Sequence, residues 1–266
     1  MGLASAAVTL TPDSVRLDDT VAVVTGAAVG IGRATAIALA EFGAQVAVCD
    51  RDEANLTTCV EAIEARGRRA FPGVLDVRDG AAVGLWVAAT AEHFGRLDVL
   101  VNNAGGGFRS DFVDVTENGQ DALMRENFTS VTHCVRAAVP HFPSTGGSIV
   151  NITSIEAHRA APGFAVYSAM KAAVTNLTES LALELGARSV RVNCVAPDVI
   201  PTPGIGEIPV RTPLPRAGHV DDVAAAVVFL ANPRLSGFVT GSTIHVDGGN
   251  RAAGGWRRVA DGSFTT

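Results

Sequence analysis

The sequence is poor in the residue patterns that build disulfide frameworks and metal sites. Its 266 residues include four cysteines, and none of them forms a Cys-x-x-Cys pair. The six histidines are scattered and form neither a His-x-x-x-His nor a His-Glu-x-x-His motif. We therefore expect no disulfide framework, no zinc site and no catalytic metal. Free, buried thiols fit the reducing cytoplasm, where we expect this protein to act.

The chain also lacks a long apolar run and an excess of positive charge. No stretch approaches the roughly 20 apolar residues that a membrane-spanning helix needs. Residues 1–17 have no basic segment followed by an apolar core, so they do not resemble a signal peptide. The formal net charge is −6, which argues against a nucleic-acid partner, because nucleic-acid phosphates bind to basic surfaces. We expect neither a membrane nor a nucleic-acid partner.

The chain does contain a regular alternation of short β-branched apolar runs and longer helical patterns. Such alternation predicts βαβ units and a parallel sheet that is buried on both faces. The expected strands cover 21–26, 45–50, 69–77, 97–105, 147–154, 190–197 and 242–249. The expected helices cover 31–42, 53–66, 79–94, 117–142, 165–186 and 221–231. We predict an α/β protein: one doubly wound domain with a seven-stranded, mostly parallel sheet and helices on both faces.

Three segments lie outside this rhythm. Residues 1–17 are interpreted as an N-terminal extension, and 18–250 as the domain. The segment 198–218 holds five prolines and is interpreted as a substrate lid, because long loops in compact domains often cover a site. Residues 251–266 form a C-terminal tail, in which Trp256 and Phe264 predict a docking surface at a subunit interface rather than a frayed end.

A glycine-rich turn joins the first expected strand to the first expected helix. It reads TGAAVGIG, with Gly26, Gly30 and Gly32 around Ile31. Glycines there let the backbone approach a pyrophosphate, and the helix N-terminus supplies free N–H groups and a positive dipole end. The spacing differs from the commoner Gly-x-Gly-x-x-Gly fingerprint, and a purely structural turn is the alternative.

Acidic residues end the next two expected strands. Asp50 can accept hydrogen bonds from the ribose diol of an adenosine and would repel a 2′-phosphate, which favours NAD over NADP. Arg51 complicates this interpretation, since an arginine could bind that phosphate, but adjacent side chains of a strand point in opposite directions. Asp76 is placed to meet the adenine amine, with capping of the following helix as the alternative.

The only tyrosine of the chain, Tyr167, lies four residues before Lys171. This spacing places both side chains on one face of a helix. A nearby ammonium would lower the pKa of the phenol and make it a usable proton shuttle. Ser154 ends the fifth expected strand, at the edge where parallel sheets bind ligands. A surface pair on an amphipathic helix is the alternative.

Taken in order, these pieces resemble the short-chain dehydrogenase/reductase family, in its short, single-domain branch with a Rossmann fold. The resemblance spans roughly residues 17–250. It rests on the glycine turn, on the two strand-end aspartates, and on Asn-Asn-Ala-Gly at 102–105. It also includes Asn127, Ser154, the Tyr-x-x-x-Lys pair, Pro197 and the closing Val-Asp-Gly-Gly.

The resemblance implies a role for each of these positions. Tyr167 would be the general acid and base, and Lys171 would hold the nicotinamide ribose and lower the tyrosine pKa. Ser154 would orient the substrate oxygen, and Asn127 would bend its helix and hold a water. The cofactor NAD would contact the turn, the strand ends and the lid: Gly26, Gly30, Ile31, Gly32, Asp50, Arg51, Asp76, Val77, Asn103, Ala104, Gly105, Tyr167, Lys171, Pro197, Val199 and Thr202. A homotetramer is also implied.

The motifs do not identify the small-molecule alcohol or ketone substrate. The residues expected beside it are Ser154, Ile155, Glu156, Phe164, Tyr167, Val199 and Phe108, with Ile205, Ile208 and Val210 from the lid. Most are apolar, which favours a bulky lipophilic compound such as a steroid or terpenoid. A 3-oxoacyl-thioester reductase is the first alternative, and a non-catalytic cofactor-binding regulator is the second. Glu156 would bind a polar substrate group or be an exposed loop residue.

One position departs from the family. Asp198 follows Pro197 where relatives usually carry glycine. If the backbone needs a positive φ there, a side chain costs steric strain. Its carboxylate would also lie near the nicotinamide and favour NAD⁺ over NADH. The alternative is that Asp198 turns outward into solvent.

Overall fold

The computed structural model describes residues 9–202, 209–210, 212–259 and 262–265. Its centre is a seven-stranded sheet with the order β3-β2-β1-β4-β5-β6-β7, in which every pair is parallel. The strands are β1 (Val21–Thr25), β2 (Gln45–Asp50), β3 (Ala70–Val74), β4 (Val99–Asn102), β5 (Gly147–Ile152), β6 (Val190–Pro197) and β7 (Thr243–Val246). The predicted seven-stranded, doubly wound α/β fold is confirmed.

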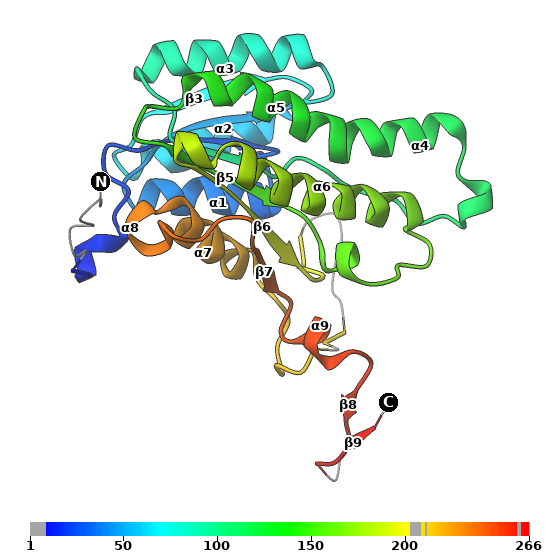
Figure 1. Ribbon diagram of the computed structural model, residues 1–266. Helices are drawn as coiled ribbons and strands as arrows, with labels where there is room; N and C mark the ends of the chain where they lie inside the picture. Colours follow the sequence, from blue (N-terminus) through cyan, green and yellow to red (C-terminus); the bar gives the residue numbers. More distant parts are fainter. Residues whose placement is uncertain (1–8, 203–208, 211, 260–261, 266) are drawn as a thin grey trace.

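Helices cover both faces of this sheet (Figure 1). One layer contains α1 (Gly30–Glu41), α2 (Glu53–Glu64) and α7 (Val220–Ala231). The other contains α3 (Gly80–Phe94), α4 (Glu117–Met124), α5 (Ser130–Ala138) and α6 (Ala165–Glu184). A short helix α8 (Pro233–Ser236) follows α7. Within the described residues, no helix has the length and apolar character that crossing a bilayer requires.

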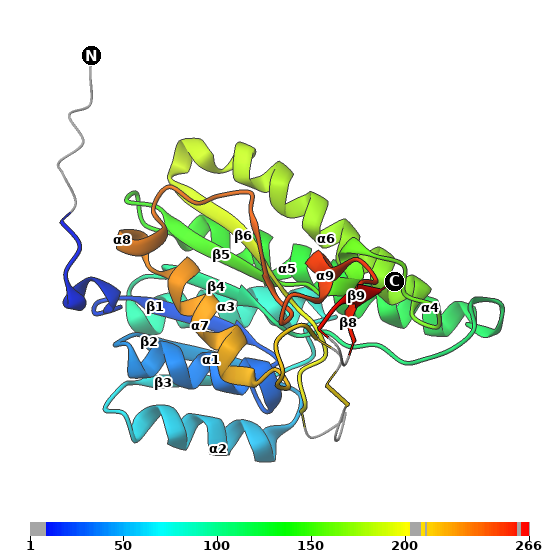
Figure 2. The same ribbon diagram turned by 90° about the horizontal axis from the view of Figure 1, so that it is seen from below.

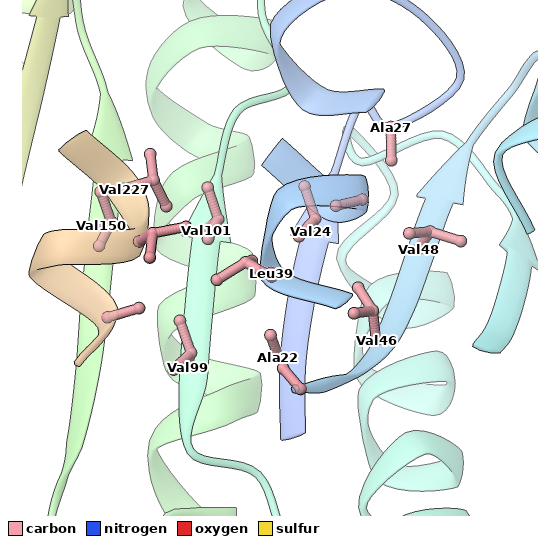
Figure 3. Close-up of a cluster of buried hydrophobic side chains, with 14 of the residues drawn as sticks. Ala22, Val24, Ala27, Leu39, Val46, Val48, Val99, Val101, Val150 and Val227 are labelled. Atoms are coloured by element: carbon pink, nitrogen blue, oxygen red, sulfur yellow. The ribbon is translucent and has the colours of Figure 1, made fainter. Parts of the chain in front are cut away.

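Each face of the sheet has its own apolar core because successive strand residues point to opposite faces. On one face, Leu39 of α1 and Val227 of α7 lie over Val24, Val101 and Val150, and all five side chains are fully buried (Figure 3). The strands read as continuous apolar runs, as expected for strands that are covered on both sides.

The expected helix 117–142 is interrupted. A π-helical turn, Arg125–Thr129, separates α4 from α5 and contains the buried Asn127. Single π turns within helices are frequent at functional sites because they redirect a side chain. Here the interruption follows from hydrogen bonds of Asn127 that are described with the site.

The N-terminal part of the chain enters the core earlier than residue 18. Leu17 is buried, and its backbone N–H donates to the carbonyl of Phe42 at 2.7 Å. The Asn232 amide donates to the carbonyls of Ser14 (2.9 Å) and Arg16 (3.2 Å). The segment from the 3-10 turn Pro12–Val15 onward therefore packs on the domain.

The C-terminal tail has secondary structure of its own. A helical turn α9 (Asn250–Ala253) precedes a small hairpin of β8 (Arg257–Arg258) and β9 (Phe264–Thr265). The hairpin projects away from the body (Figure 1), and the Trp256 side chain is exposed. The side chain of Phe264 lies outside what the structure describes.

Candidate active site

One long cavity of about 780 Å³ runs along the carboxyl ends of the strands. These ends gather at one edge of the molecule (Figure 2), which is where open parallel sheets bind ligands. Among the predicted site residues, the following line it: Gly26, Gly30, Ile31, Asp50, Arg51, Asp76, Val77, Asn103, Ala104, Gly105, Ser154, Glu156, Phe164, Tyr167, Lys171, Pro197, Val199 and Thr202. Gly32 and Asn127 lie behind the lining instead.

The glycine turn adopts a backbone shape that strongly favours glycine. Gly26 and Gly30 adopt φ values of 65° and 61°, in the left-handed region where a side chain costs energy. Gly32 has an ordinary φ, but a Cβ on it would lie 2.1 Å from the Gly26 carbonyl oxygen. No side chain caps the N-terminus of α1, so its first N–H groups are available to an anionic ligand.

The end of β4 is fastened to this turn. The Thr25 hydroxyl accepts hydrogen bonds from the backbone N–H groups of Asn103 (3.1 Å) and Ala104 (3.0 Å). The Asn103 amide donates to the carbonyls of Thr25 (3.0 Å) and Gly26 (2.9 Å). These bonds explain why β4 ends at Asn102, several residues earlier than expected.

At the far end of the cavity, Asp50 is fixed at the tip of β2. Its carboxylate accepts hydrogen bonds from the backbone N–H groups of Ala28 and Asp52, both at 3.1 Å. Asp76 accepts a bidentate pair from the guanidinium of Arg78, which holds the pKa of this carboxyl below its usual range. Capping of α3 belongs to Asp79, so the alternative role considered for Asp76 is wrong.

At the opposite end, three polar side chains meet. Ser154 follows β5, Tyr167 and Lys171 lie on α6, and Ser154 and Lys171 are buried. The Lys171 ammonium donates to the carbonyl of Ile152 at 3.1 Å and lies 5.6 Å from the centre of the Tyr167 ring. The Ser154 hydroxyl accepts the backbone N–H of Glu156 at 3.1 Å, which fixes its direction.

The pKa of Tyr167 differs from the expectation. Burial raises it, the nearby Ser154 hydroxyl lowers it in part, and the charge of Glu156 raises it further. Burial also lowers the pKa of Lys171 to about 8. The net pKa of Tyr167 is thus raised and not lowered as expected, because burial disfavours the phenolate.

Asn127 supports this end from behind. Its amide nitrogen donates to the carbonyls of Gly106 (2.8 Å) and Leu123 (3.0 Å), and its oxygen accepts the N–H of Gly106 at 3.1 Å. A Cβ on Gly105 would lie 2.8 Å from that oxygen and 3.0 Å from the Lys171 nitrogen. The π turn thus holds the loop after β4 against Lys171.

The lining near Tyr167 combines apolar side chains with acidic ones. Ile155, Phe164, Val199 and Ile200 supply the apolar part. Glu156 and Asp198 also line the cavity, and the Glu156 side chain is only 22% exposed. The expectation of an exposed loop glutamate is therefore wrong.

Other expected pocket residues lie elsewhere. Phe108 and Val210 are absent from the cavity lining and are about half exposed, at 46% and 49%. Ile205 and Ile208 lie outside the described residues. The lid is therefore represented in the cavity by its first residues, up to Thr202.

Comparison with known proteins agrees with this geometry. A family model described as enoyl-(acyl carrier protein) reductase matches residues 26–251. The chain belongs to the short-chain dehydrogenases/reductases. It is therefore an oxidoreductase, as the Ser154, Tyr167 and Lys171 constellation indicates.

Individual relatives of this dehydrogenase/reductase differ in substrate. The chain is 38% identical over 242 residues to a (hydroxy(phenyl)methyl)succinyl-CoA dehydrogenase subunit from Thauera aromatica, covering 88% of this chain and 97% of that one. It is 37% identical over 243 residues to a 3-oxoacyl-(acyl-carrier-protein) reductase from Thermotoga maritima, covering 88% and 98%.

Solved structures differ in cofactor. A short-chain dehydrogenase from Mycobacterium paratuberculosis bound to NAD superposes with a TM-score of 0.85 at 31% identity, covering 89% of this chain and 99% of that one. One from Burkholderia cenocepacia in complex with NADP gives 0.84 at 36% identity, covering 88% and 98%. The family thus supports a nicotinamide dinucleotide cofactor in general terms.

Asp198, the departure from the family pattern, causes no backbone strain in this dehydrogenase/reductase. Among the described non-glycine residues, positive φ values occur at Asp19 and Ser189 and not at Asp198. Its carboxylate accepts a hydrogen bond from the Asn250 amide at 2.6 Å and lies 3.6 Å from the Arg159 guanidinium. The expectation of strain is wrong, and so is the alternative of an outward-turned side chain, which is only 10% exposed.

Several residues of the site were not predicted from the sequence. Arg159 comes from the loop after β5 and Asn250 is the first residue of α9, and no motif marks either of them. Gly107 passes so close to Tyr167 that a Cβ would lie 3.0 Å from the ring. Its position, two residues after the Asn-Asn-Ala-Gly motif, was the one available signal.

Proposed function

We propose that this dehydrogenase/reductase interconverts a secondary alcohol and a ketone with NAD(H), and that Tyr167 transfers the proton. The observation that carries the proposal is that one cavity joins Ser154, Tyr167 and Lys171 at one end to Asp50 at the other. A reacting carbinol can then lie beside the phenol while a dinucleotide spans the strand ends. The intact set of three polar residues argues against a non-catalytic regulator.

The residues that would hold the cofactor fit its chemistry. The uncapped N-terminus of α1 suits a pyrophosphate, and the fixed carboxylate of Asp50 suits a ribose diol. Lys171 would hold the nicotinamide ribose, Pro197 and Val199 would lie along the nicotinamide end, and Thr202 would meet a phosphate beside the glycine turn. When bound, the nicotinamide ring supplies the hydride acceptor or donor.

The proton chemistry is assigned to this chain's own groups. In ketone reduction, Ser154 donates a hydrogen bond to the substrate oxygen and Tyr167 gives it a proton. In alcohol oxidation, the Tyr167 oxygen takes that proton back. The raised pKa of Tyr167 keeps the phenol protonated at neutral pH, which suits the reductive direction.

Asp50 is expected to set the choice of cofactor. Its carboxylate would repel the 2′-phosphate of NADP, and Val29 in the glycine turn supplies no basic side chain. We expect kcat/KM for NAD to exceed that for NADP by about tenfold or more, which is ~1.4 kcal/mol. Asp50→Ala should narrow this ratio, and steady-state kinetics with both cofactors measures it. Equal kcat/KM values in the wild type would contradict the assignment.

The apolar lining supports a substrate with a bulky lipophilic body, such as a steroid or terpenoid. Ile155, Phe164, Val199 and Ile200 would contact this body. The second candidate is a 3-oxoacyl thioester, which the relatives that act on acyl-carrier-protein and CoA compounds favour. A panel of secondary alcohols and 3-hydroxyacyl thioesters, assayed for NADH formation, decides between them.

We also propose a homotetramer that acts in the cytoplasm, where the buried free thiols stay reduced. The projecting hairpin with the exposed Trp256 is assigned to contacts between subunits. Deleting residues 254–266 should therefore weaken assembly and lower thermal stability, as measured by light scattering and calorimetry. Unchanged mass, stability and kinetics would show that the tail has no such role.

A further inference from the structure

The substrate end of the cavity contains a carboxylate that neither cofactor binding nor proton transfer requires. Glu156 lies in the 3-10 turn Ile155–His158, two residues after Ser154. Both of its oxygens accept hydrogen bonds from the Arg159 guanidinium, at 2.7 and 3.3 Å. Arg159 itself is not part of the cavity lining. Glu156 therefore stands between the arginine and the space that a substrate would occupy.

We propose that Glu156 accepts a hydrogen bond from a substrate hydroxyl on the carbon next to the reacting carbinol. The preferred substrate class is then a vicinal diol in oxidation, or an α-hydroxyketone in reduction, attached to a lipophilic body. This inference rests on the proposed function, since it places the reacting oxygen at Ser154. The backbone N–H of Glu156 donates to that same serine hydroxyl, so its side chain starts next to the reacting atoms.

The charge of Glu156 opposes the chemistry of its neighbour. It raises the pKa of Tyr167 beyond the effect of burial, which disfavours the phenolate needed for alcohol oxidation. An apolar residue in its place would avoid this cost. Residues that break a local rule are expected where function needs them, and recognition of a substrate donor supplies such a need.

The pairing with Arg159 selects a neutral donor. A bidentate arginine uses one lone pair on each carboxylate oxygen of Glu156. The remaining lone pairs can accept a hydrogen bond from a donor group of a substrate in the cavity. An ammonium group on the substrate would approach the Arg159 guanidinium, which Glu156 and Asp198 already hold in place. A carboxylate on the substrate would meet the negative charges of Glu156 and Asp198. A hydroxyl group avoids both conflicts.

Asp198 and Asn250 act as positioning residues for this arrangement. Arg159 lies between Glu156 and Asp198, and Asn250 donates to the other oxygen of Asp198. The loop after β5, the start of the lid and the base of the tail are thereby joined behind the subsite. The charge of Asp198, at the position where the family usually carries glycine, is thus directed at Arg159.

The test compares three probes that share a phenyl group and a reacting carbinol: 1-phenylethanol, styrene glycol and 2-amino-1-phenylethanol. The wild type with NAD should show a kcat/KM for the glycol about tenfold above that for 1-phenylethanol. A preference for the amine over the glycol overturns the inference, as do equal values for all three. A wild type that oxidises no secondary alcohol overturns the proposed function itself.

Two variants separate recognition from a structural role. In Glu156→Gln the glycol preference should fall to about onefold to threefold. The pH profile for 1-phenylethanol oxidation should also move to lower pH, because the charge that raises the Tyr167 pKa is gone. Glu64→Gln, which makes the same change on the exposed part of α2, should alter neither quantity. An unchanged glycol preference in Glu156→Gln overturns the inference, and the wild-type ratio tests it even if that variant fails to fold.

Discussion

Tyr167→Phe should lower turnover by about 10²-fold or more while the protein continues to bind NAD. The substitution removes the proposed proton donor and keeps the ring that packs against Phe164 and beside Gly107. General acid–base catalysis typically contributes 10²–10⁴-fold. The phenol is not the main anchor of the cofactor, since the turn, Asp50 and Lys171 would provide its contacts. Steady-state kinetics and calorimetric titration with NAD measure the two effects.

Ser168→Ala is the matched control for this variant. It removes a hydroxyl from the residue next to Tyr167 on α6. In the wild type this Ser168 hydroxyl donates a hydrogen bond to the carbonyl of Ala165. We expect this control to leave turnover within a factor of about two to three. The direction of the wild-type pH profile adds a second check. Because the pKa of Tyr167 is raised, alcohol oxidation should increase as pH rises, and ketone reduction should persist to alkaline pH. A near-normal rate in Tyr167→Phe would refute the proton-transfer role.

Lys171→Met should reduce kcat/KM by about 10²-fold or more and should stabilise the folded protein. The activity falls because the variant lacks the ammonium that would hold the nicotinamide ribose and that lies 5.6 Å from the centre of the Tyr167 ring. Stability rises because burial penalises the ammonium, as its pKa of about 8 against an ordinary 10.5 shows. That difference corresponds to ~3 kcal/mol at neutral pH. Losing the hydrogen bond to Ile152 offsets about 1–2 kcal/mol of it.

The size of this stability gain depends on pH. Below pH 8 the wild type carries the whole penalty, because the unfolded chain binds the proton more tightly than the folded one. Between about pH 8 and 10.5 the folded lysine is neutral, and the unfolded chain loses the free energy of binding its proton as pH rises. The stability that Lys171→Met gains over the wild type therefore shrinks over this range. Denaturant unfolding of both proteins at neutral pH and near pH 10 measures this change. A variant that is less stable than the wild type at neutral pH would contradict this interpretation.

The fold was largely predictable because both faces of the sheet are buried, and strands that are buried on both sides appear in the sequence as continuous apolar runs. All seven strands lie within the predicted ranges. The errors have local causes. β4 ends early because the Thr25 hydroxyl accepts hydrogen bonds from the backbone N–H groups of Asn103 and Ala104. The helix 117–142 contains a π turn because the Asn127 amide donates a hydrogen bond to the carbonyl of Gly106. Both causes are contacts over long sequence distances, which a periodic pattern does not encode.

The site residues that belong to a sequence motif could be predicted. Residues that come together only through tertiary contacts between loops could not. The glycine turn, Asp50, Ser154, Tyr167 and Lys171 fall along one cavity as expected. The Glu156, Arg159 and Asp198 cluster joins two loops and carries no spacing rule. The pKa of Tyr167 was misjudged for a related reason, since the sequence shows a nearby lysine but not the burial of the phenol that raises its pKa.

The most direct test of the central claim follows the hydride itself. A secondary alcohol that carries deuterium on its carbinol carbon is incubated with the enzyme and NAD, and the NADH formed is analysed by mass spectrometry. If a hydride passes from that carbon to the nicotinamide, each NADH gains one deuterium, and Tyr167→Phe gives almost no product. NADH without deuterium, or no NADH with any secondary alcohol of the panel, would contradict the claim.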